Sequence, residues 1–143
     1  MPKKAQKKTK KKIDNNAPKG ELTIRTLAMP SDTNPHGDIF GGWVLSQMDI
    51  AGGIFTRKYT GQKTVTVAVD AMEFLLPVLV GDVLCCYCEI EKLGRTSITV
   101  KVQVWVSRQF EHDRIKVTEG TFTYVAIDAT RRPMVIRRGR ELI

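Results

Sequence analysis

The stretch from Asn34 to Phe55, NPHGDIFGGWVLSQMDIAGGIF, most constrains what this chain can fold into. Turn residues and the pair Gly41-Gly42 open it, and the next nine residues contain neither glycine nor proline, which is typical of a loop that leads into a helix. At 100° per residue, two mostly apolar stripes lie on nearly opposite sides, one formed by Val44, Leu45, Met48, Ala51 and Phe55 and the other by Trp43, Gln47, Ile50 and Ile54. We expect a helix that is apolar on both sides to be buried.

A third stripe of this helix consists of small residues and one acid, namely Gly42, Ser46, Asp49 and Gly53. We expect another element to approach this side closely and to meet Asp49. A carboxylate in a buried helix is unfavourable unless it is paired, hydrogen-bonded or open to a wet cleft. The residues alone leave two interpretations open: a structural carboxylate, bonded to the backbone or to an arginine such as Arg95, and a catalytic one.

The strand signals follow the helix, which should end near Lys58. From Thr64 onward the apolar residues recur at every second position, most regularly between Ile98 and Val106. The expected strands span residues 21–29, 64–74, 82–93, 98–106 and 115–127. In the last of them the apolar phase shifts around Gly120, which predicts a β-bulge there.

One long helix and about five strands joined by short turns predict an α+β domain in two layers, with an antiparallel sheet that wraps the helix. A single sheet of this kind leaves its edges and one face uncovered, so we expect the protein to form dimers or larger assemblies.

The net charge of +8 at first suggests a nucleic-acid-binding protein. Seven lysines and no acid lie in residues 1–12, however, so the rest of the chain carries a net charge of only +1. We interpret residues 1–20 as a disordered basic arm with no specific nucleic-acid partner, residues 21–136 as the folded domain and residues 137–143 as a basic tail. The Arg-rich end from Arg131 to Arg140 is expected to be exposed and only partly ordered.

The three cysteines, Cys85, Cys86 and Cys88, share one apolar run, and neither histidine is near them in the sequence. No metal-ligand spacing or redox-cofactor motif is present. On a strand Cys86 and Cys88 would share one face and Cys85 the other, and we expect all three to be buried reduced thiols of a cytoplasmic protein. No signal peptide and no membrane-spanning segment are predicted.

Four segments together resemble the hotdog-fold acyl-CoA thioesterases of the YciA type. They are LAMPSDTNPHGDIFGGWVLSQMDIAGG, VTVAVDAMEFLLPVLVGDVL, KLGRTSI and VKVQVWV, and the similarity extends over about residues 21–136. The resemblance implies the hotdog fold, in which a five-stranded antiparallel sheet wraps a long central helix. It also implies homodimers with a continuous sheet, assembled as trimers of dimers into a homohexamer.

The same resemblance implies an active site at the dimer interface, where the start of one protomer's helix faces the helix carboxylate of the other. Asp49 corresponds to the catalytic acid of the family, acting either as a general base toward water or as a nucleophile that forms a mixed anhydride. Asn34 and Asp38 lie in the loop that supplies polar groups near the reacting centre. For Asp38 a water-positioning role and a purely structural role, in the loop or as a helix cap, both remain open.

Two further groups are expected to bind the substrate. Free backbone N–H groups at the helix start can stabilise an oxyanion, and they belong to Gly41, Gly42 and Trp43. By resemblance, the turn that approaches coenzyme A consists of Gly94, Arg95, Thr96 and Ser97, whose guanidinium, hydroxyls and N–H groups suit phosphate. Coenzyme A is part of the substrate and product, and no separate cofactor or metal is expected.

The predicted function is therefore hydrolysis of acyl-CoA thioesters to free carboxylic acid and coenzyme A, within fatty acid metabolism. One alternative is a non-enzymatic acyl-CoA-binding regulator of the same fold, which would need a DNA-reading element that the lysine arm does not resemble. A hydratase of this fold would need a histidine beside an acid in the site, and neither His36 nor His112 lies on the long helix.

Overall fold

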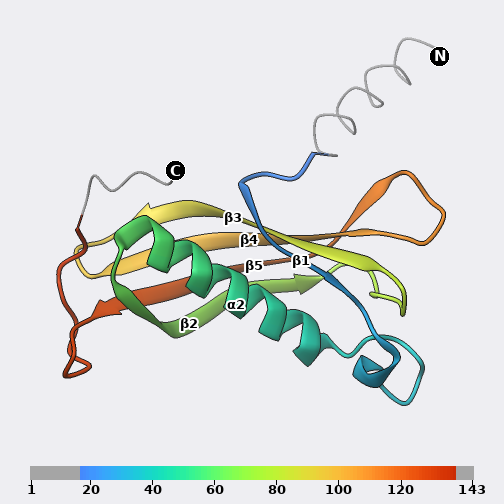
Figure 1. Ribbon diagram of the computed structural model, residues 1–143, viewed down its shortest axis with the longest axis horizontal. Coiled ribbons are helices and arrows are strands. Elements are labelled where there is room, and N and C mark those ends of the chain that lie inside the picture. The colour runs from blue at the N-terminus through green and yellow to red at the C-terminus, as the bar shows by residue number, and fades with distance from the viewer. Residues whose placement is uncertain (1–16, 138–143) are drawn as a thin grey trace, which may run out of the picture.

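The computed structural model describes residues 17–137 of the 143-residue chain (Figure 1). Most of the predicted basic arm and the predicted tail from residue 138 lie outside the described residues. The elements are β1 (Glu21–Leu27), the 3-10 helix η1 (Pro30–Asp32), α2 (Gly41–Thr60), β2 (Lys63–Phe74), β3 (Val83–Leu93), β4 (Ser97–Ser107) and β5 (Arg114–Ile127). All the predicted strands are present, and no bound differs from its expected position by more than two residues.

In this part of the chain, the five strands form one antiparallel sheet, as predicted, and their order in it is β1-β3-β4-β5-β2. The short turns pair β3 with β4 and β4 with β5, whereas β2 pairs with β5 and becomes an edge strand. The connection from β2 to β3 therefore crosses the end of the sheet. Backbone bonds from Leu75 and Leu76 to the Val117 carbonyl and from Ile39 to the Val78 carbonyl hold this connection beside the start of α2.

Helix α2 lies along one face of the sheet (Figure 1). It ends at a left-handed Gly61, whose N–H donates to the Arg57 carbonyl at 2.7 Å. The first predicted stripe, including Met48 and Phe55, packs into the core. The expectation that both stripes are buried is wrong for the single chain, because Ile50 on the second stripe is 51% exposed.

A β-bulge was predicted at Gly120, and the structure has two register shifts near this residue, one in β5 and one in β2. Between β4 and β5 the register shifts at Val117, so Val117 and Thr118 are both buried although they are consecutive. Opposite Gly120, it is β2 that breaks register, and a Cβ atom on Gly120 would overlap the Met72 sulfur. Glycine at this position therefore leaves room for a side chain of the neighbouring strand.

The cysteines lie as predicted. Cys86 and Cys88 belong to the core beneath α2, while Cys85 packs on the opposite face of the sheet with Tyr87 and Trp105. All three are buried and free.

Both ends of the described chain contact the sheet. The Lys19 N–H donates to the Gln103 side chain at 3.1 Å, so the segment before β1 is already attached. At the other end, Ile136 is buried and its N–H donates to the Arg95 carbonyl at 2.9 Å. The C-terminal segment is thus packed as far as Ile136, rather than exposed throughout.

Candidate active site

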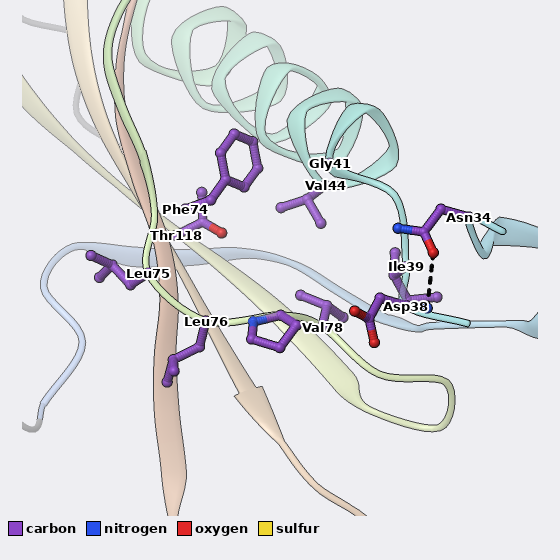
Figure 2. Close-up of a pocket in the computed structure, with 11 residues that line it drawn as sticks. Asn34, Asp38, Ile39, Gly41, Val44, Phe74, Leu75, Leu76, Val78 and Thr118 are labelled. Atoms are coloured by element: carbon purple, nitrogen blue, oxygen red, sulfur yellow. Dashed lines mark hydrogen bonds between the residues drawn. The ribbon is translucent and has the colours of Figure 1, made fainter. Parts of the chain in front are cut away.

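The loop before α2 is shaped by the side chain of Asn34. Its Oδ1 accepts hydrogen bonds from the His36 N–H at 2.9 Å and from the Asp38 N–H at 3.1 Å, the second of which is drawn in Figure 2. The Asn34 N–H in turn donates to the Asp38 carbonyl at 2.7 Å. This local network closes the loop, holds the Asp38 carboxylate at the rim of a pocket and leaves His36 exposed.

The start of α2 has no side-chain cap. The N-cap residue is Phe40, in an extended conformation, so the interpretation of Asp38 as a helix cap is wrong. The Trp43 N–H already donates to the Phe40 carbonyl at 3.1 Å. Helix geometry leaves the N–H groups of Gly41 and Gly42 without an intrahelical acceptor, so these two are the better candidates for binding an oxyanion.

A pocket of about 300 Å³ lies beside this helix start (Figure 2). Asn34, Asp38 and Gly41 form its polar rim, and its other lining residues are mostly apolar and come from α2 and the β2–β3 connection. Thr118 of β5 also lines it, and the hydroxyl of Thr118 is buried without a hydrogen-bond partner among the described residues.

Asp49 lies two turns farther along α2, in a second pocket of about 280 Å³ that also includes Gly42 and Ser46. Its Oδ1 accepts a hydrogen bond from the Thr66 hydroxyl at 2.6 Å and another from the Tyr124 hydroxyl at 3.1 Å. The sequence suggested the backbone or Arg95 as a structural partner of this carboxylate, but among the described residues neither donates a hydrogen bond to it. The carboxylate is instead held by two hydroxyl groups at the edge of a pocket.

Sequence reasoning missed both Thr66 and Tyr124. The two residues lie directly opposite each other in the pairing of β2 with β5. Only this register brings them together, because they are far apart in the chain. The alternation of β2 and β5 placed each on a strand but gave no signal of which residues would face Asp49.

The sequence predicted that another element packs closely against the stripe of small residues, but the close contact is at Gly52, one position before Gly53 of that stripe. A Cβ atom on Gly52 would overlap the Tyr124 hydroxyl, while nothing lies within 4 Å of one on Gly53. Burial, followed by the proximity of the Asp49 carboxylate, raises the pKa of Tyr124 far above its ordinary value. The Tyr124 hydroxyl therefore remains a hydrogen-bond donor at any pH at which the protein would work.

The predicted coenzyme A turn joins β3 to β4 at the opposite end of the sheet from the helix start (Figure 1). The Gly94 N–H donates to the Ser97 carbonyl at 2.8 Å, and the Thr96 carbonyl accepts from the Ala126 N–H at 2.9 Å. The Arg95 side chain is exposed.

One chain therefore does not bring all the predicted site residues together. Asn34, Asp38 and Gly41 line the first pocket, whereas Gly42 and Asp49 line the second. Asp49 lies seven positions after Gly42, which corresponds to about 10 Å along a helix. A group that attacks a carbonyl must approach to about 3–3.5 Å, and this separation favours a thioester that is not bound at the helix start of the same chain.

Within residues 17–137 no group of three or more His, Cys, Asp or Glu side chains is arranged to hold a metal ion. None of the helices in this range is long and apolar enough to cross a membrane.

Comparison with known proteins assigns the chain to a family. The model of the Thioesterase superfamily matches residues 36–109. The acyl-CoA thioester hydrolase YciA of Salmonella typhimurium is 51% identical over 122 residues, covering 83% of this chain and 92% of that protein. Among solved structures, the hexameric thioesterase y2039 from Yersinia pestis has a TM-score of 0.80 at 51% identity, covering 85% of this chain and 98% of the other. HI0827, a hexameric broad specificity acyl-coenzyme A thioesterase, has a TM-score of 0.79 at 50% identity, covering 85% of this chain and 84% of the other.

The chain thus belongs to the hotdog-fold thioesterase superfamily and, within it, to the YciA type of acyl-CoA thioesterases.

Proposed function

We propose that this protein hydrolyses acyl-CoA thioesters to a carboxylic acid and coenzyme A, with Asp49 as the catalytic carboxylate. The assignment rests on the hydrogen bonds and the position of the Asp49 carboxylate. Its Oδ1 is held by two hydroxyl donors, and the residue lines the second pocket. The family membership of the chain supports the same reaction.

Two chemical routes suit this arrangement. In the first, Asp49 takes a proton from water as the water oxygen attacks the thioester carbonyl carbon. In the second, the carboxylate itself attacks, the C–S bond breaks, and water then hydrolyses the mixed anhydride. In both routes the carbonyl oxygen gains negative charge, which the N–H groups of Gly41 and Gly42 stabilise, and coenzyme A leaves as a thiolate that takes up a proton.

The proposed site is completed by a second copy of the chain. Because Asp49 lies about 10 Å along the helix from Gly42, each carboxylate would serve a thioester bound at the partner's helix start. A twofold axis produces two such sites, since the same contact is made in both directions. The exposed edge strand β2, on which Val67 is 55% exposed, and the exposed Ile50 of α2 supply an apolar surface for this pairing. We propose that such dimers assemble into hexamers, the state reported for the similar Yersinia and HI0827 proteins.

Other groups of the site have supporting roles. Asn34 shapes the loop that presents Asp38, which we propose positions water or substrate at the pocket rim. The turn from Gly94 to Ser97 would bind the phosphates of coenzyme A. The folded domain is proposed to span residues 21–136, with the basic segments at either end outside the catalytic unit. No separate cofactor is needed, and the three buried free thiols support a cytoplasmic location.

The experiment that tests the function measures thiol release from acyl-CoA esters of increasing chain length. The wild type should turn over at least one ester, and Asp49→Ala should lose about a hundredfold or more in kcat, as expected for the removal of a catalytic acid or base. Asp113→Ala, which removes an exposed carboxylate in the β4–β5 loop, serves as the control and should retain activity. Binding of acyl-CoA without hydrolysis by the wild type would instead support a regulatory protein.

A further inference from the structure

We propose that Tyr124 is a positioning residue that fixes the orientation of the Asp49 carboxylate for catalysis. The proposal rests on the catalytic role of Asp49 given above. Tyr124 acts through Asp49, because its hydroxyl contacts both the carbonyl oxygen and the carboxylate of that residue.

The Tyr124 hydroxyl contacts both the backbone and the side chain of Asp49. It lies 3.0 Å from the Asp49 carbonyl oxygen and 3.1 Å from Asp49 Oδ1, so its single hydrogen is shared between two acceptors. Thr66 donates to the same Oδ1 at 2.6 Å. Two donors on one oxygen define the plane of the carboxylate and leave Oδ2 without a donor among the described residues. Oδ2 is therefore the oxygen available to water or to the thioester.

The position of the Tyr124 ring is itself fixed. The side chain is only 1% exposed, and its ring stacks on Phe122 with the centroids 6.4 Å apart and an angle of 17° between the planes. On the helix side, Gly52 leaves the space that the hydroxyl occupies. A rigid ring on the sheet thus reaches the helix at a glycine, where no side chain intervenes.

The consequence concerns the rate of reaction rather than the binding of substrate. Without the hydroxyl, Asp49 keeps only the bond from Thr66 and can turn about its side-chain torsions. The reactive orientation then becomes one of several, which lowers the rate of the chemical step while the rest of the site still binds acyl-CoA.

The variant Tyr124→Phe tests this without creating a cavity. We expect kcat to fall about tenfold while KM stays within about twofold, as for a lost interaction that matters in the transition state. The control is Tyr87→Phe, because Tyr87 is also buried and its hydroxyl also makes a hydrogen bond, from Arg114, but on the opposite face of the sheet. Tyr87→Phe should leave kcat unchanged. Both variants should be compared with the wild type by thermal unfolding.

A second measurement separates positioning from a general structural effect. In an Asp49→Ala background, assayed at high enzyme concentration, Tyr124→Phe should cause no further loss, because residues that act through one another are not additive. The same tenfold loss in both backgrounds would overturn the proposal, as would an unchanged kcat or a rise in KM alone in the wild-type background. A wild type that hydrolyses no thioester would instead refute the proposed function, and would leave Tyr124 no reaction to serve.

Discussion

Gly52 of α2 and Tyr124 of β5 meet so closely that the tyrosine hydroxyl occupies the space of a missing side chain. This contact predicts a large effect for Gly52→Ala. Alanine is favoured over glycine in a helix by about 1 kcal/mol, but overpacking of a core costs about 1–3 kcal/mol. The clash is with a buried ring whose Cζ atom would lie 2.6 Å from the new Cβ, so overpacking should dominate. We expect a net loss of about 1–2 kcal/mol in the free energy of unfolding, measured with urea.

The neighbouring variant Gly53→Ala is the matched control, because nothing lies within 4 Å of a Cβ atom there. It should gain up to about 1 kcal/mol from helix propensity. Equal stabilities of the two variants would show that the Tyr124 ring moves aside easily.

The hydroxyl of Thr118 supplies a second prediction. It is buried with no partner in residues 17–137, and such a group costs about 1–3 kcal/mol relative to one that is hydrogen-bonded. Thr118→Val keeps the shape of the side chain and removes the polar atom. We expect the free energy of unfolding to rise by about 1 kcal/mol. A clear loss of stability would mean that a water molecule or another group satisfies this hydroxyl in solution.

Local patterns predicted the elements of this fold well. The glycine pair and the uninterrupted run after it indicated a helix that starts close to the pair, and α2 begins at Gly41. The alternation of β4 located that strand to within one residue at each end. These features depend on neighbours in the sequence, so the chain alone contains the information. The hotdog arrangement was expected from the resemblance, because short turns would not have placed β2 beside β5.

The detailed site depended on non-local register and on a second chain. The sequence predicted a close approach at Gly53, but the Tyr124 side chain packs against Gly52 instead. The two glycines are adjacent in the chain and differ by a rotation of 100° about the helix axis. The partners of Asp49 come from two strands whose pairing the sequence does not encode locally. The side of α2 that carries Ile50 is apolar for a reason that the sequence does not reveal, since Ile50 remains exposed among residues 17–137.

The exposed Arg95 should affect the binding of coenzyme A and not the chemical step. We expect Arg95→Ala to raise KM for an acyl-CoA about tenfold through the loss of a charge-assisted phosphate contact, with kcat little changed. For the corresponding acyl-pantetheine, which lacks the nucleotide, KM should not change. Arg114→Ala, at the other end of the sheet, is the control. An equal rise in KM for both thioesters would show that Arg95 does not bind the nucleotide part of coenzyme A.

The buried thiols predict a loss of stability at alkaline pH. Burial raises the pKa of Cys88 from 9.0 to about 12, and it raises the pKa of Cys86 further. Above pH 9 the unfolded chain releases these protons while the folded chain retains them, so the stability present below pH 9 is lost as the pH rises toward 12. The slope should reach about 1.4 kcal/mol per pH unit for each thiol. Urea unfolding between pH 8 and about 10.5 measures it, and Cys88→Ala should make the slope shallower.

The exposed Ile50 tests whether the active site needs two chains. Replacing it with arginine puts a charge in the apolar surface that α2 and β2 present, and a desolvated unpaired charge strongly opposes association. We expect Ile50→Arg to lower the mass measured by light scattering and to lose activity in parallel, because Asp49 lies about 10 Å along the helix from its own Gly42. Lys92→Glu, which changes the charge at an exposed position of β3, should keep both the assembly and the activity. A folded, fully active Ile50→Arg monomer would contradict a site shared between protomers, because a single chain would then be enough for catalysis.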